Sequence, residues 1–196
     1  MSLKGYIKEN LPCIRSIYRK RLAPINLIHN IFDKPIVVLL YHRVNYLNRD
    51  LFNINVTPDN FERHIRILKN HYNVITFNDL KRNDIKEPSV IITFDDGYYD
   101  NYKYAFPILK KYQVPATIFI TSGGVDTGKE FWWDRLETVL FENKNLRESI
   151  ELDILNQRHV FDVSDDKKRL YSFYTLHHML FSLRPNERDM MLDRWY

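Results

Sequence analysis

The sequence predicts an α/β fold that is built on a parallel β-sheet. Three apolar runs of strand length, Ile36–Tyr41, Ser89–Phe94 and Pro115–Thr121, are separated by segments whose apolar residues recur at helical spacing. Strands that alternate with helices in this way are typical of βαβ units, in which the strands run parallel. The fully apolar run Ile36–Tyr41 is expected to be a buried strand of this sheet. Such sheets bind ligands at the carboxyl ends of their strands. We therefore expect a functional site where these three runs end.

The first helix of this pattern is predicted to begin at Thr57, which suits an N-cap, with Pro58 at the first helical position. The apolar stripe of this helix consists of Phe61, Ile65 and Leu68. A second, shorter strand is expected over residues 73–76, and a short helix or turn over residues 77–80. These elements all lie between the strand at Ile36–Tyr41 and the strand at Ser89–Phe94.

The second long helix is predicted to follow Gly97 directly. Pro107 should lie in or near its first turns or kink it, because proline lacks the N–H that an interior helical residue donates. The apolar residues at helical spacing in this helix are Tyr102, Ala105, Phe106 and Leu109.

The last third of the chain has a different pattern and is mainly helical. Residues 167–183 are amphipathic, and Pro185 is placed to start a further helix that runs to the chain end. Between the helices, residues 150–163 look like a hairpin. Its facing apolar residues are Ile150, Leu152 and Ile154 on one strand and Val160, Phe161 and Val163 on the other. The chain is thus divided into residues 1–34, 35–130 and 131–196.

The charge of the chain is concentrated at its N-terminus. Of the net charge of +4, residues 1–34 carry +5 and the remainder carries −1, which argues against a nucleic-acid footprint over the fold. Residues 1–34 have the spacing of a basic amphipathic helix, which would either pack on the domain or lie on a membrane surface. No signal-peptide pattern or membrane-spanning run is present, so we expect a cytoplasmic protein or one peripheral to a membrane.

The predicted sheet has too few strands to close on itself. Four parallel strands leave unpaired edges, and the pattern after residue 131 does not return to the sheet. We therefore expect the chain to be a fragment of a longer protein, with an open sheet that is prone to self-association.

Two adjacent carboxylates, Asp95 and Asp96, end the apolar run at Ser89–Phe94 and are followed by Gly97. Two carboxylates in one pocket disfavour each other's ionisation, and a divalent cation would relieve that repulsion. Alternatively, one of them caps the helix that follows. The spacing alone favours neither interpretation.

Four stretches of the sequence together resemble the polysaccharide deacetylase family, also called the NodB-homology domain or carbohydrate esterase family four. They are LYHRV at 40–44, ITFDDGY at 92–98, AFPIL at 105–109 and VPATIFI at 114–120. The resemblance covers about residues 35–135, and FWWDRL at 131–136 is similar to members that carry a helical insertion.

The resemblance implies a distorted (β/α) barrel of which residues 35–130 are the N-terminal part, with residues 131–196 as the helical insertion. It also implies metal-dependent removal of N-acetyl or O-acetyl groups from a carbohydrate. Asp95 would be the general base and Asp96 a ligand of the metal, usually zinc. His42, Tyr98 and Trp132 are candidates for substrate binding, although each could equally serve packing.

The chain departs from the family pattern because its second motif is absent, and the later motifs, with a further arginine and a catalytic histidine, are missing as well. The family's second motif has two histidines four residues apart, and no two of the seven histidines in this chain have that spacing. We therefore expect this chain to bind zinc weakly or not at all. The alternatives to an enzyme are an inactive or truncated module that binds carbohydrate or a partner, and a nucleotide-binding protein suggested by the P-loop-like residues 123–130, which lack the final Ser/Thr.

Overall fold

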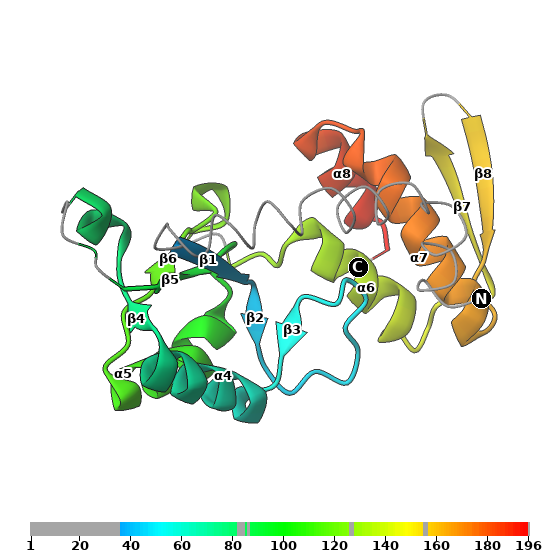
Figure 1. The fold of residues 1–196 in the computed structure, drawn as a ribbon. Coiled ribbons are helices and arrows are strands. Elements are labelled where there is room, and N and C mark those ends of the chain that lie inside the picture. The colour runs from blue at the N-terminus through cyan, green and yellow to red at the C-terminus, as the bar shows by residue number, and fades with distance from the viewer. Residues whose placement is uncertain (1–35, 82–84, 86, 126–127, 155–156, 196) are drawn as a thin grey trace, which may run out of the picture. The chain divides into compact units, whose positions relative to one another are not determined.

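The structure is a computed structural model that describes residues 36–81, 85, 87–125, 128–154 and 157–195 (Figure 1). The predicted N-terminal helix, residues 1–34, lies outside these residues. The chain divides into two compact units between Thr121 and Ser122, whereas the sequence pattern places a division after residue 130.

The first unit is built on a four-stranded parallel sheet, which confirms the predicted α/β class. Its strands are β1 (Ile36–Tyr41), β4 (Asn73–Val74), β5 (Ser89–Phe94) and β6 (Thr117–Ile118). β5 lies at the centre and pairs with β1 along its whole length. On its other side, β5 pairs with β4 near its start and with β6 near its end.

Two strands are shorter than the sequence predicts. β4 was expected over residues 73–76 and β6 over residues 115–121, but each has two residues. They share one edge of β5, where β4 pairs at Ser89 and Val90 and β6 at Thr93 and Phe94. Because one six-residue edge serves both partners, neither can extend far along it. A second parallel pair, β2 (Arg43–Val44) with β3 (Asn55–Val56), was not predicted.

Helix α4 (Pro58–His71) begins as the sequence predicts. The Thr57 hydroxyl accepts a hydrogen bond from the Asn60 N–H, and Pro58 occupies the first helical position. The predicted stripe is buried and packs in the core with three residues of β5. The residues of this group are Phe61, Ile65, Leu68, Val90, Ile92 and Phe94. A 3₁₀-helix, η1 (Phe77–Lys81), takes the place of the predicted short helix or turn.

The second long helix begins with a wide turn. Residues Asn101–Ala105 form a π-helix, η2, and α5 (Phe106–Tyr112) continues from it. The Phe106 N–H donates to the Asn101 carbonyl, five residues back. Pro107 has no N–H to close the ordinary bond to residue 103, and its ring crowds that carbonyl, so a widened turn relieves the clash. α5 lies against α4 on one face of the sheet (Figure 1).

Only half of the predicted apolar face of this helix is buried. Ala105 and Leu109 belong to the core, whereas Tyr102 and Phe106 are exposed. Tyr102 stacks on Phe106 with nearly parallel rings whose centroids are 6.0 Å apart. The two aromatic residues therefore lie on the outer side of the helix, which corrects the prediction.

Strand β1 has the predicted bounds but not the predicted burial. An apolar run of this kind was expected to be buried on both faces, yet Val38 and Leu40 are 51% and 54% exposed. Among the residues that the structure describes, β5 is the sole strand that pairs with β1, so the opposite edge of β1 is open. An open apolar edge is a template for pairing with another chain.

We expect the 196-residue chain to self-associate through β1. The double substitution Val38→Lys and Leu40→Lys should shift the chain toward monomer, because lysines on an edge strand oppose pairing. Sedimentation velocity and light scattering at several concentrations would measure the shift. Val160→Lys, at an exposed strand position of the second unit, is the matched control. A monodisperse, monomeric parent chain would show this expectation to be wrong.

The second unit contains a short 3₁₀-helix, η3 (Ser122–Gly124), followed by three α-helices and a hairpin within the described residues. They are α6 (Trp132–Phe141), β7 (Ser149–Ile154), β8 (Gln157–Asp162), α7 (Asp166–Phe181) and α8 (Pro185–Leu192). The hairpin confirms the interpretation of residues 150–163, and β7 and β8 are antiparallel. One facing residue was wrong, because Val160 pairs with Glu151 and is exposed while Phe161 and Val163 are buried.

Helix α8 starts at Pro185 as predicted but ends at Leu192, short of the chain end. No helix among the described residues has the length and apolarity that crossing a bilayer requires.

Candidate active site at the end of strand β5

The loop Asp95–Gly97 is held by the ends of the neighbouring strands. The Asp95 N–H donates to the carbonyl of Tyr41, the last residue of β1, at 3.0 Å. The Asp96 carbonyl accepts from the Thr121 N–H, beyond β6, at 3.2 Å. The sequence-based expectation that the acids follow β5, at the carboxyl end of the sheet, is confirmed in position.

The backbone of this loop is strained. Asp96 has φ +70° and Gly97 has φ +78°, so two successive residues adopt the left-handed conformation. A Cβ on Gly97 would lie 3.2 Å from two side-chain carbons of Ile120, so any other residue there would be strained by the positive φ and crowded against Ile120. A non-glycine residue in such a conformation costs on the order of 1–3 kcal/mol and is typical of functional sites.

The electrostatic environment links Asp96 to His42 and Asp95. Burial raises the pKa of the Asp96 carboxyl, the charge of Asp95 raises it further, and the charge of His42 offsets part of the rise. The structure therefore brings three of the five candidate residues into electrostatic range of one another. Neither acid caps the following helix, which is already helical at Tyr99 and Asp100: among the described residues, neither carboxylate accepts a hydrogen bond from a backbone N–H of that helix.

We expect Asp96→Asn to stabilise the chain at neutral pH. The pKa of this carboxyl is higher in the folded state than in the unfolded state. It therefore stabilises the folded state at pH values below the unfolded-state pKa, and this stabilisation is lost as the pH rises through the folded-state pKa. Asparagine removes the charge and also tolerates a left-handed backbone. Thermal melts at pH 7 and near pH 3 should show a higher Tm for the variant at pH 7 and a smaller difference at pH 3. An equal or lower Tm at pH 7 would contradict the expectation.

A buried network beside the acids was missed by the sequence analysis. Asp100 is 5% exposed and accepts from the Arg43 Nε at 2.9 Å, from the Val44 N–H at 3.3 Å and from the Asn45 side-chain amide at 3.3 Å. The Arg43 guanidinium also lies over the Tyr98 ring, 4.2 Å from its centroid. Arg43 directly follows His42 and Asp100 is near Asp96 in sequence, but nothing local indicates that they pair.

Trp132 lies in the second unit and is engaged there. Its ring stacks on His177 with the centroids 4.7 Å apart, and the Arg188 guanidinium lies 4.5 Å from the ring centroid. These contacts are consistent with the packing interpretation of Trp132, and its role in substrate binding stays a prediction. His178 is exposed and His177 partly buried on α7.

Metal-ligating side chains do not gather in the part of the chain that the structure describes. No group of three or more His, Cys, Asp or Glu side chains is found among those residues. Catalytic zinc takes three protein ligands, and weak zinc binding by this chain stays a prediction.

Comparison with known proteins identifies the segment that carries the acids. A family model described as polysaccharide deacetylase matches residues 82–146, which include β5, the acid pair and η2. This part of the chain belongs to the polysaccharide deacetylase family. The deacetylase segment thus contains Asp95, Asp96 and Tyr98, whereas His42 precedes it in the chain.

Curated relatives extend the deacetylase match along the chain. YxkH of Bacillus subtilis (strain 168), assigned to the polysaccharide deacetylases, is 41% identical over 96 residues, which cover 45% of this chain and 33% of YxkH. A poly-β-1,6-N-acetyl-D-glucosamine N-deacetylase of Staphylococcus aureus (strain MSSA476) is 31% identical over 173 residues, which cover 80% of this chain and 52% of the relative. The chain thus spans about half or less of the length of these relatives.

Among solved structures, IcaB from Ammonifex degensii is 28% identical, with a TM-score of 0.45. The match covers 55% of this chain and 49% of that one.

Proposed function

We propose that the acid pair is the catalytic centre of a polysaccharide deacetylase that hydrolyses acetyl groups on a carbohydrate. The observation that carries the proposal is the loop Asp95–Gly97. It has a strained backbone, ends the central strand and lies inside the deacetylase-matched segment. The similarity to the poly-β-1,6-N-acetyl-D-glucosamine N-deacetylase of Staphylococcus aureus favours a polymer of N-acetylglucosamine as the substrate class.

Asp95 is proposed as the general base. It accepts a proton from water as the water oxygen attacks the carbonyl carbon of the N-acetyl group. The carbon–nitrogen bond then breaks, the amine nitrogen takes up a proton, and acetate and a free amine leave. The position of Asp95 supports this role, because its N–H is bonded to the carbonyl at the end of β1 and its carboxyl lies within electrostatic range of Asp96.

Asp96 is proposed as one ligand of a divalent cation, with zinc the usual metal of the family. A cation in this position would polarise the acetyl carbonyl and its bound water. The raised pKa of Asp96 supports the assignment, because a cation at that carboxylate would offset the cost of burying its charge. The remaining ligands have to come from groups other than those described.

His42 and Tyr98 are proposed to contact the sugar at the rim of the site. His42 is close enough to influence the Asp96 pKa, and Tyr98 is held in place by the Arg43 guanidinium. Trp132 is kept as a third candidate. We further propose that the parallel sheet is part of a distorted (β/α) barrel and that residues 131–196 are a helical insertion in it.

The proposal is tested by release of acetate from an N-acetylglucosamine oligomer. The assay uses the complete gene product, whether it equals this chain or extends beyond it, supplied with zinc. The double variant Asp95→Asn with Asp96→Asn should release no acetate above background. Asp153→Asn, the same change at an exposed strand residue of the second unit, should leave the rate unchanged. A parent protein that binds the oligomer without releasing acetate would favour the binding-module alternative.

A further inference from the structure

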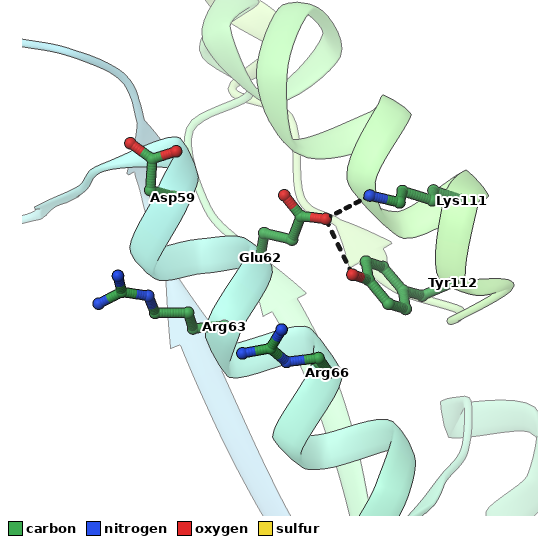
Figure 2. Close-up of a pocket in the computed structure, with 6 residues that line it drawn as sticks. All are labelled: Asp59, Glu62, Arg63, Arg66, Lys111 and Tyr112. Carbon is green, nitrogen blue, oxygen red and sulfur yellow. Dashed lines mark hydrogen bonds and ion pairs between the residues drawn. The ribbon is translucent and has the colours of Figure 1, made fainter.

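A second polar pocket lies over helices α4 and α5 and contains none of the acid-pair residues. Its volume is about 560 Å³ (Figure 2). Four of its lining residues come from α4 and two from α5. They are Asp59, Glu62, Arg63, Arg66, Lys111 and Tyr112.

The two carboxylates of this pocket already have hydrogen-bond donors. The Glu62 Oε1 accepts from the Lys111 Nζ at 2.6 Å and from the Tyr112 hydroxyl at 2.8 Å. The Asp59 carboxylate accepts from the Tyr46 hydroxyl at 3.1 Å. The pKa of Glu62 is held below its usual value, chiefly by the hydrogen bond from Lys111, so Glu62 stays ionised and occupied over the physiological range.

The two arginines of the pocket form no hydrogen bond or ion pair with any other residue that the structure describes, and the charge of Arg66 contributes only the smallest part of the lowering of the Glu62 pKa. Arg63 and Arg66 are exposed and stand three residues apart on α4, a spacing that places their side chains on one face of the helix. Figure 2 shows both guanidinium groups extending in the same direction from α4. Both side chains offer a ligand only N–H donors and no acceptor.

We propose that this pocket binds a phosphate group through Arg63 and Arg66. A guanidinium presents a planar fork of donors that matches two oxygens of a phosphate, and two such forks on adjacent turns can hold one tetrahedral oxyanion. Lys111 is paired with Glu62 and so offsets the charge of that carboxylate. The phosphate could be a free ion or the headgroup of an anionic lipid, since both present the same oxygens.

The test measures binding of inorganic phosphate to the 196-residue chain by isothermal titration calorimetry. Arg63→Gln and Arg66→Gln should each weaken binding by at least tenfold, because each removes a charge-assisted hydrogen bond. Lys69→Gln is the matched control, since it removes the same charge from an exposed residue of α4 that does not line the pocket. Glu62→Gln should tighten binding, because it removes the nearer negative charge. Circular dichroism confirms that each variant is folded.

Vesicles distinguish the two sources of phosphate. Co-sedimentation with vesicles that contain phosphatidylglycerol, lost in the Arg63→Gln and Arg66→Gln variants, would assign the ligand to a lipid headgroup. Saturation by inorganic phosphate without co-sedimentation would assign it to a soluble phosphate. The proposal is overturned if neither probe binds, or if Lys69→Gln weakens binding as much as the pocket variants do, because the attraction would then belong to the whole basic surface.

Discussion

Replacing Asp95 by asparagine in the complete gene product is expected to lower the deacetylation rate by about 10²–10⁴-fold while leaving bound metal unchanged. Asparagine has nearly the same size but cannot accept a proton from the attacking water. Asp96→Ala should lose activity and metal together, because it removes a proposed ligand. This division of roles is the one that the resemblance to the deacetylase family implies, and Asp96 is the acid with the left-handed backbone and with a pKa raised chiefly by burial.

Metal content by elemental analysis and initial rates on the same preparations would check both variants. Asp153→Asn serves again as the control for removing a carboxylate elsewhere. Equal loss of metal in the two variants would refute the separate roles. Undiminished activity in Asp95→Asn would refute Asp95 as the base, even if Asp96 proved to be a ligand.

The second large effect is expected at Asp100, whose replacement by alanine should destabilise the first unit by about 3 kcal/mol. Asp100 accepts three hydrogen bonds in a buried position, from the Arg43 side chain, the Val44 N–H and the Asn45 amide. Removing it leaves those donors without their acceptor, and the Arg43 side chain is only 20% exposed. Urea denaturation would measure the loss.

The paired substitution Arg43→Leu with Asp100→Leu separates the ion pair from its environment. If the buried charge that has lost Asp100 causes the instability, the double variant should be more stable than Asp100→Ala, because it removes the Arg43 guanidinium together with Asp100. The control variant Asp153→Asn, at an exposed position, should have a free energy of unfolding within about 0.5 kcal/mol of the parent value. An equally small change in the free energy of unfolding of Asp100→Ala would mean that the network contributes little to stability.

The features that the sequence predicted correctly are those that depend on neighbouring residues. The bounds of β1 and β5, the N-cap at Thr57 and the acid pair at a strand end are all local patterns. The burial of β1 was predicted wrongly, because burial depends on what covers a strand rather than on its own composition.

The features that were missed depend on residues far apart in the chain. The lengths of β4 and β6 depend on how two strands divide one edge of β5. The pairing of Arg43 with Asp100 joins positions 57 residues apart, so neither residue's surroundings in the sequence indicate it. Composition and periodicity do not report such partners.

The π-helical turn at Asn101–Ala105 sets the angular relation between the acid loop and helix α5. A π-turn amounts to one extra residue within an α-helix, and each α-helical residue advances the chain by about 100°. Deleting one residue from Asn101–Ala105 could restore regular helical bonding, but it would rotate Asp100 and the loop before it by about that angle relative to the buried face of α5. Residues 101–105 should therefore tolerate substitutions far better than insertions or deletions. In a natural variant with a deletion at this turn, we expect that the acid pair would no longer be aligned with the end of β1.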